Sequence, residues 1–256
     1  MKNYSFTQML TCLSFLIFST LSHSLLANSN DSLLLNAEDK VFQAFVSGKI
    51  EGTPQKLNEL SEQLEGLFQN SKQPLAAYWL AYNQYYQTIF YMMSEDKANA
   101  KTAVKFGIKL LKGLEKKSSE DYALLASLQS LSIPLYSMVQ AIAISSKVNK
   151  NGQKALQMDK NNLRAHLVLG SSDYYKPTQY GGGKKVEKYL LEAIRLPRQQ
   201  VTNPYLPSWG KNTAYEVLIR FYLREDRKED AKAMFKKATA EFPNDYQINQ
   251  LAKELI

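Results

Sequence analysis

Apolar residues recur every three to four positions along most of this chain, and short polar stretches separate the periodic segments. One clear stripe consists of Leu57, Leu60, Leu64, Leu67 and Phe68. Residues at this spacing share one face of an α-helix. No segment resembles the strands and βα turns of a parallel sheet, and residues that favour helix dominate the composition. We therefore predict an almost entirely helical, all-α protein.

Helix-breaking residues between the stripes predict a series of helix pairs. Thr53 and Pro54 form a helix start, with threonine as the N-cap and proline in the first turn, and Gly48 and Gly52 end the preceding helix. Pro134 predicts another break, because proline lacks a backbone N–H and crowds the preceding turn. The pairs are expected within residues 37–68, 74–107, 122–156, 163–197 and 212–245.

The segment from 212 to 245 has the most regular pattern. Each of its two helices carries one stripe, and the second stripe alternates small and large side chains. Small residues let two helix backbones approach, a large one fills the space between them, and a proline ends the second helix. These positions are Tyr215, Leu218, Tyr222, Ala231, Phe235, Ala238 and Pro243.

This spacing resembles the tetratricopeptide repeat (TPR), a helix–turn–helix unit of about 34 residues. Ile219 stands where the consensus has glycine. Residues 163–197 resemble the repeat as well, with Gly170 at the glycine position, and weaker copies precede them. One repeat cannot bury its apolar face alone, so the resemblance implies an α-solenoid of stacked TPR-like hairpins. We expect a single domain over 37–256, with residues 246–256 capping the last repeat.

The first 27 residues differ from the rest of the chain. They begin with Lys2, continue as an apolar stretch and contain no acidic residue. This pattern predicts a secretory signal peptide over residues 1–27, cleaved after Ser24 or Ala27. An uncleaved N-terminal anchor is the alternative. Residues 28–36 are polar, and we expect them to be flexible.

Cysteine content and charge bear on location and partners. Cys12 is the single cysteine, so cleavage would leave a chain without disulfides or zinc–thiolate sites. The signal predicts export to the periplasm or cell envelope of a bacterium, which argues against nucleic acid as a partner. The formal net charge is +8. Its lysines suit solvated helix faces, and peripheral association with a membrane remains a candidate role.

The sequence offers little for catalysis. His166 is the histidine that a mature chain would keep, and its apolar-facing position predicts packing. No nucleophile–base or metal-binding motif is present. The Gly181–Lys185 run lacks the Ser or Thr of a phosphate loop, and a structural turn is the main interpretation. We predict a protein that is not an enzyme and needs no cofactor or metal.

The TPR resemblance also implies where ligands bind. In that family the contacts come from the inner face of the first helix of each pair. The corresponding positions include three arginines, which predict a basic groove for a carboxylate or an acidic peptide tail. Together with an aromatic residue of the long turn at 174–183, the candidate binding residues are Arg164, Ser171, Tyr174, Tyr175, Tyr180, Glu216, Arg220 and Arg224.

Two functions are consistent with these features. The first is a scaffold in the cell envelope that binds a protein or peptide in its groove. The second is a periplasmic protein that binds a small anionic solute or assists its transport. Residues 164–194, with the run KPTQYGGG, resemble envelope TPR-type proteins that include solute-binding transport accessories. The identity of the partner and the oligomeric state stay open.

Overall fold

The computed structural model describes residues 32–198 and 203–255, and every regular element in these ranges is helical. The predicted signal peptide at residues 1–27 lies outside the described residues. None of the helices described is both long and apolar enough to cross a membrane.

The α-helices are α2 (Ala37–Glu51), α3 (Gln55–Ser71), α4 (Pro74–Met93), α5 (Lys97–Gly113), α6 (Ser119–Ser132), α7 (Met138–Met158), α8 (Leu163–Tyr175), α9 (Val186–Arg195), α10 (Lys211–Arg224), α11 (Lys228–Glu241) and α12 (Tyr246–Gln250). Short 3-10 helices are η1 (Ile133–Leu135), η2 (Thr178–Tyr180) and η4 (Leu251–Glu254).

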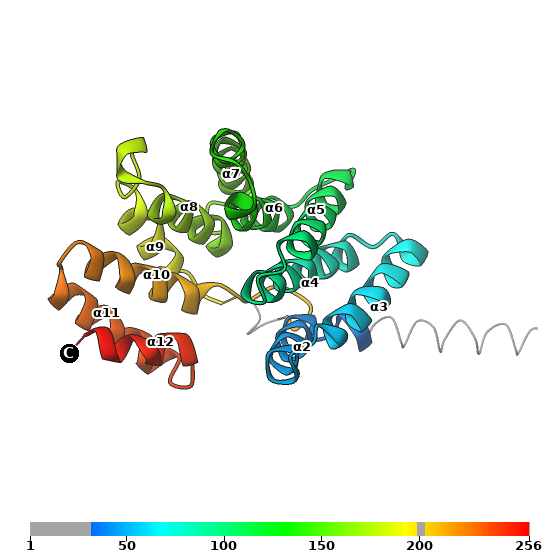
Figure 1. Ribbon diagram of the computed structural model, residues 1–256, viewed down its shortest axis with the longest axis horizontal. Helices are drawn as coiled ribbons and strands as arrows, with labels where there is room; N and C mark the ends of the chain where they lie inside the picture. Colours follow the sequence, from blue (N-terminus) through cyan, green and yellow to red (C-terminus); the bar gives the residue numbers. More distant parts are fainter. Residues whose placement is uncertain (1–31, 199–202, 256) are drawn as a thin grey trace, which may run out of the picture.

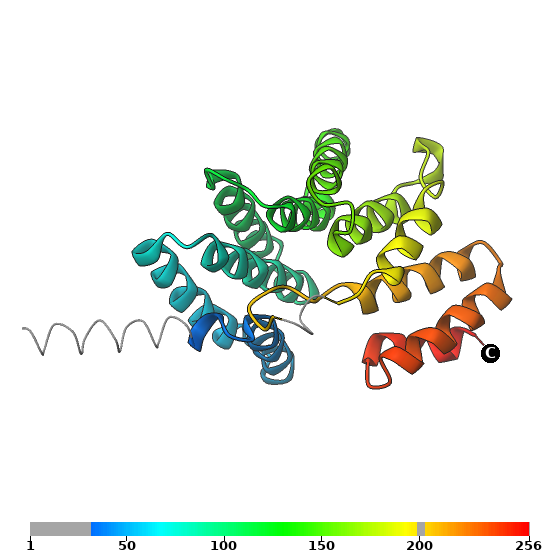
Figure 2. The same ribbon diagram turned by 180° about the vertical axis from the view of Figure 1, so that it is seen from behind.

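The helices pack as successive antiparallel pairs in two layers. From α2 to α11, each helix contacts the next one along the chain, and α2, α4, α6, α8 and α10 also contact each other in sequence order. These even-numbered helices form the inner layer, and α3, α5, α7, α9 and α11 form the outer layer. The array curves into an arc, seen from both sides in Figures 1 and 2. This arrangement confirms the predicted TPR-like solenoid.

The repeat pattern places its small residues at close helix contacts. Ala231 and Ala238 of α11 are fully buried, as is Leu218 of the facing helix α10. At Gly170 of α8 an added Cβ would lie 2.7 Å from the side chain of Leu190 in α9. Glycine at this position therefore sets how closely α8 and α9 approach.

Several local predictions need correction. Helix α2 continues through Gly48 and ends at Gly52, which has a positive φ. Helix α3 begins after Pro54, and no side chain caps its first turn, so Thr53 is not the N-cap. The predicted break at Pro134 is present, because α6 ends at Ser132 and Pro134 lies in the short helix η1 that follows. The apolar residue Val139, part of the pattern that predicted α7, is exposed.

Both ends of the described domain are anchored. Ile248 and Leu251 of the C-terminal segment are fully buried, and α12 contacts both helices of the last repeat. The Asp245 side chain caps α12 by accepting from the Ile248 N–H. At the other end Leu34 is buried and the Asn36 N–H donates to the Pro204 carbonyl. The described part of the segment expected to be flexible therefore packs against the domain.

The close approach at Gly170 yields a testable prediction. Gly170→Ala should lower the free energy of unfolding by about 1–3 kcal/mol, because the methyl group collides with buried Leu190. Gly66→Ala, in α3, is the matched control, since an added Cβ there meets no atom within 4 Å. The control should raise stability by about 0.5–1 kcal/mol. Urea unfolding of both variants checks this, and equal stabilisation by both would contradict it.

Candidate functional site

The connection between α9 and α10 crosses the inner side of the arc. Figures 1 and 2 show its later part running from α2 to the start of α10. The Pro204 carbonyl accepts from the backbone N–H of Asn36, and the Tyr205 carbonyl accepts from the indole N–H of Trp79 at 3.1 Å. Residues 203–210 are called the crossing loop below. Part of the inner face is therefore covered by a segment of the protein itself.

One carboxylate of α2 holds the end of the crossing loop. Glu38 accepts from the backbone N–H groups of Ser208 at 2.6 Å and Trp209 at 3.1 Å. Burial raises the pKa of Glu38 above its usual value, although the hydrogen bond from Ser208 and the nearby charge of Arg164 oppose the rise. This carboxylate therefore fixes a turn of the loop at a cost in solvation.

Trp209 is the centre of the contact between the loop and α4. Its ring stacks on Tyr82 and Tyr85, with centroids 5.4 and 6.4 Å away, and its indole N–H donates to the Tyr78 hydroxyl at 2.9 Å. Tyr78, Tyr82 and Trp79 are buried. Burial raises the pKa of Tyr78 well above its ordinary value. The first part of the α4 aromatic cluster is therefore core, on which the loop rests.

The structure places Arg164 in the interior of the protein. The predicted basic groove had instead placed this side chain on the surface. Its side chain is fully buried and forms a two-point ion pair with Glu120, with distances of 2.5 and 2.7 Å. It also donates to the Trp209 carbonyl at 3.3 Å. Arg164 therefore joins α8, α6 and the crossing loop.

A partly exposed aromatic surface lies beside this interior cluster. Tyr85 and Tyr86 of α4 are half-buried, whereas Tyr175 at the end of α8 is 71% exposed. Burial raises the pKa of Tyr85, and the nearby groups Tyr86, Tyr175 and Glu216 raise it further. Tyr85, Tyr175 and Glu216 belong to α4, α8 and α10, so side chains of these three inner helices lie within electrostatic range of one another. We call Tyr85, Tyr86, Tyr175, Glu216 and Arg220 the inner aromatic surface.

The two arginines predicted on α10 already have partners. Arg220 pairs with Glu216 and with Glu254, each at 3.1 Å. Arg224 donates to the Tyr174 carbonyl at 2.7 Å, and its guanidinium lies 4.3 Å from the centre of the Tyr174 ring. The cations on this side therefore lie among carboxylates and aromatic rings, and each of the two arginines predicted on α10 already has a partner.

The glycine-rich turn after α8 is a self-contained structure. Gly181 and Gly183 have positive φ, and an added Cβ at Gly182 would collide with a backbone oxygen at 1.9 Å. The Asp173 carboxylate accepts from the Lys185 N–H at 2.6 Å and so occupies the start of α9. This agrees with the interpretation as a structural turn. Tyr180 is half-exposed on this turn, away from the contacts described for Tyr175.

Ser171 also lies near this region, in the last half of α8. Its hydroxyl is buried, and it has no hydrogen-bond partner among the described residues. The burial of Arg164 argues for a structural role. The other predicted ligand contacts stay predictions: Ser171, Tyr174, Tyr175, Tyr180, Glu216, Arg220 and Arg224.

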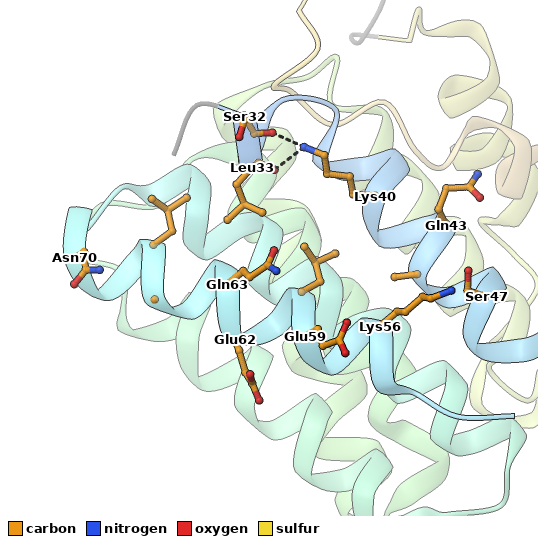
Figure 3. A pocket seen from close by; sticks show the side chains of 14 residues that line it. Ser32, Leu33, Lys40, Gln43, Ser47, Lys56, Glu59, Glu62, Gln63 and Asn70 are labelled. Carbon is orange, nitrogen blue, oxygen red and sulfur yellow. Dashed lines mark hydrogen bonds between the residues drawn. The ribbon is translucent and has the colours of Figure 1, made fainter. Parts of the chain in front are cut away.

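A cleft of about 790 Å³ lies between α2 and α3 (Figure 3). Both charge signs line it, including Lys56 and Glu59. The Lys40 amine points at the backbone carbonyls of Ser32, Leu33 and Leu35 and donates to all three. Its charge is thereby committed to the N-terminal segment, so the cleft offers weak recognition for an anion.

Two kinds of residue relevant to catalysis can be located in the structure: possible metal ligands and His166. Across residues 32–198 and 203–255, no three His, Cys, Asp or Glu side chains group as metal ligands. His166 is half-buried, contacts the Lys160 carbonyl through Nε2 at 2.9 Å and packs beside Tyr189. It is therefore a packed histidine, as the sequence predicted.

Sequence reasoning missed Glu38 and Trp209 as structural determinants, and it did not identify Glu120 as the partner of Arg164. One signal was available in the unusual length of the connection between α9 and α10, together with its Pro-Ser-Trp-Gly ending at Gly210. The partners of that segment, which include Glu38, Tyr78 and Arg164, lie far from it in sequence, so spacing gives no indication of them.

Comparison with solved structures gives the fold a precedent. The chain is similar to a thermophilic TPR protein of Thermus thermophilus, with a TM-score of 0.56 at 15% identity over 86% of this chain and 98% of that one. It is also similar to the HusA haemophore of Porphyromonas gingivalis, with a TM-score of 0.55 at 19% identity over 72% of this chain and 92% of that one. No family profile and no curated protein matches the sequence. These likenesses show a TPR-like fold.

The buried carboxylate of Glu38 leads to a prediction about pH. Its pKa in the folded protein lies above the unfolded value, so between these two values the folded protein holds a proton that the unfolded chain has lost. The stability contribution of Glu38 should therefore fall as pH rises through this window. The measurement is the unfolding free energy of the wild type minus that of Glu38→Gln, from about pH 4 upward. The difference should decrease by at most about 1.4 kcal/mol per pH unit, and an increase with pH would contradict the assignment.

Proposed function

We propose that this protein is a non-enzymatic TPR-like scaffold of the bacterial cell envelope whose inner aromatic surface binds an extended segment of another protein. The observation that carries the proposal is the exposure of Tyr175 beside half-buried Tyr85 and Tyr86 on the inner helix layer. TPR-like folds generally mediate protein interactions, and the inner layer is the face that such solenoids offer to partners.

The chemistry of this surface suits a protein partner. Tyrosine offers a large apolar ring at low conformational cost, and its hydroxyl bonds to peptide groups, so tyrosines are frequent at the centre of interfaces. The Glu216–Arg220 pair next to Tyr175 places both charge signs at the rim. Partly exposed ion pairs of this kind favour one partner and one register over others.

The crossing loop supports the idea that this face recognises extended chain. Trp79 and Glu38 bind the loop through its backbone carbonyls and N–H groups, in addition to the contacts that the Trp209 side chain makes with α4. The loop covers the part of the inner face near α2 and the start of α4. A partner segment would then bind next to it, over the inner aromatic surface.

Placement in the cell envelope is part of the proposal and rests on the N-terminal sequence. Residues 1–27 combine Lys2, an apolar stretch and no acidic residue. A chain cleaved after Ser24 or Ala27 would also contain no cysteine, which suits an oxidising compartment. Mass spectrometry of the protein purified from cells tests this, because an intact N-terminus would exclude cleavage.

A second candidate is a protein that binds a planar anionic small molecule. The specific observation in its favour is the stack of half-buried Trp209 on half-buried Tyr85, together with Arg220, which lies near Tyr175 and is itself paired with Glu216 and Glu254. The similarity to a haemophore supplies a probe, since haemin is planar and carries carboxylates. Titration with haemin, followed by absorbance, tests this candidate, and Trp209→Phe should weaken any binding.

One experiment separates the two candidates. A photo-crosslinking residue replaces Tyr175 in one strain and Tyr246, on α12, in another. Tyr246 is a matched control because it is an equally accessible tyrosine, 68% exposed. A protein adduct at 175 that is missing at 246 supports the scaffold. A bound small mass in native mass spectra, without any adduct at 175, favours the second candidate.

The same pair of residues gives a quantitative prediction. Tyr175→Ala should weaken binding of the crosslinked partner by about tenfold or more, as expected for an aromatic residue central to an interface. Tyr246→Ala should leave the affinity unchanged. Because both side chains are exposed, both variants should keep the helical circular dichroism and the unfolding midpoint of the parent. Equal affinities for the two variants would place the partner elsewhere.

A further inference from the structure

Two outer-layer helices carry all their charge as lysine. Helix α5 contains five lysines and helix α7 contains three, and neither contains an acidic residue. The formal charge of these two helices equals the +8 surplus of the whole chain. The lysines are Lys97, Lys101, Lys105, Lys109, Lys112, Lys147, Lys150 and Lys154.

None of these eight lysines has a carboxylate within ion-pair distance anywhere in the described part of the chain. The C-terminal helices differ, since Lys211, Arg220, Arg224, Arg227 and Lys232 each pair with a carboxylate. Lys228, Lys236 and Lys237 of α11 have no ion pair among the described residues either, but acidic residues accompany them on that helix, whereas α5 and α7 contain none. Like charges spaced along one helix repel one another unless an anion lies between them.

The lysines border a hollow. A groove of about 380 Å³ lies between α5 and α7, and Lys105, Lys109, Lys112 and Lys147 line its walls. Ile108 and Ile144 provide apolar lining, and Tyr136, Gln129 and Ser132 provide polar atoms. The Lys101 amine, 4.5 Å from the centre of the Tyr136 ring, extends the basic wall. We call this region the basic groove. It is distinct from the arginine groove that the sequence predicted on the inner helices.

Exposed apolar side chains lie on α7, the helix that forms one wall of the basic groove. Met138, Val139 and Ile142 in the first turns of α7 are 61, 79 and 59% exposed. Val139 precedes Lys147 by two steps of four residues, so the two share a helix face. Lysines next to protruding apolar residues are the pattern by which a surface helix binds a bilayer of anionic lipids.

We propose that the basic groove binds the phosphate headgroups of an anionic membrane surface, while Val139 and Ile142 enter the interfacial layer. Charge complementarity argues for this occupant. The cations span two helices of the outer face, as a broad anionic plane requires, and the apolar residues beside them suit lipid better than free phosphate. Because the basic groove lies on α5 and α7, this proposal is independent of the inner aromatic surface and of its partner.

Vesicle flotation of the protein purified from cells tests the proposal. Vesicles of phosphatidylglycerol and phosphatidylethanolamine should float the protein at low salt, whereas pure phosphatidylcholine vesicles should not, and added salt should release it. Replacing Lys105, Lys109, Lys112 and Lys147 by glutamine should weaken vesicle binding by about 600-fold, because each lysine near an anionic surface contributes a factor of roughly five.

The matched control replaces four exposed lysines of α11, Lys228, Lys232, Lys236 and Lys237, by glutamine, which changes the net charge by the same amount. This variant should keep most of the binding. Equal losses in both variants would overturn the proposal in favour of general charge attraction. A Val139→Ser, Ile142→Ser variant should weaken binding while leaving its salt dependence in place.

Two further probes distinguish other occupants. Binding of inorganic pyrophosphate, measured by calorimetry, without any vesicle binding would assign the groove to a free phosphate compound and overturn the membrane proposal. Binding of polyglutamate without vesicle binding would assign it to an acidic protein segment and would overturn it as well. Circular dichroism of the quadruple variants should match that of the parent, because the exposed lysines pack against no core residue.

Discussion

The hydrogen bonds from the crossing loop to Glu38 join residues that lie 170 positions apart in the chain. A solenoid of helix pairs otherwise gains its stability from contacts between neighbours. Here the crossing loop adds a long-range tie: Glu38 holds its backbone, Tyr78 holds the Trp209 indole, and Arg164 reaches its carbonyl. This tie connects α2 and α4 to the start of α10 across the inner side of the arc.

The crossing loop also limits how much of the inner face is accessible to a partner. In an open TPR-like array the inner helices would present one continuous groove, but the loop fills the part near α2 and covers Tyr82 with the Trp209 ring. What stays accessible is the inner aromatic surface, where Tyr175 stands beside the Glu216–Arg220 pair. The binding surface we propose is therefore smaller and more aromatic than the repeat pattern suggests, with a defined edge made by the loop.

Charge is distributed unevenly between the two faces. The arginines of the inner side are neutralised, Arg164 by Glu120 and Arg220 by Glu216 and Glu254. The lysines of α5 and α7 on the outer side have no ion-pair partner among the described residues. Specific recognition through aromatic residues on one face and salt-dependent attachment on the other are compatible, since the two surfaces lie on different helix layers. A protein so attached would keep its inner face available to a partner.

Local features were within reach of the sequence because they depend on neighbours in the chain. Helical spacing, Pro134, and the small residues Gly170 and Ala231 determined that the protein is a helical array and where its pairs lie. The tertiary structure alone decided the path of the crossing loop and the burial of Arg164. A repeat template assigns that arginine to the inner surface by its position, but a carboxylate 44 residues earlier in the chain and a carbonyl 45 residues later draw it into the interior. Spacing records which residues share a helix face, whereas the free energy of a buried ion pair depends on partners that only the folded chain brings together.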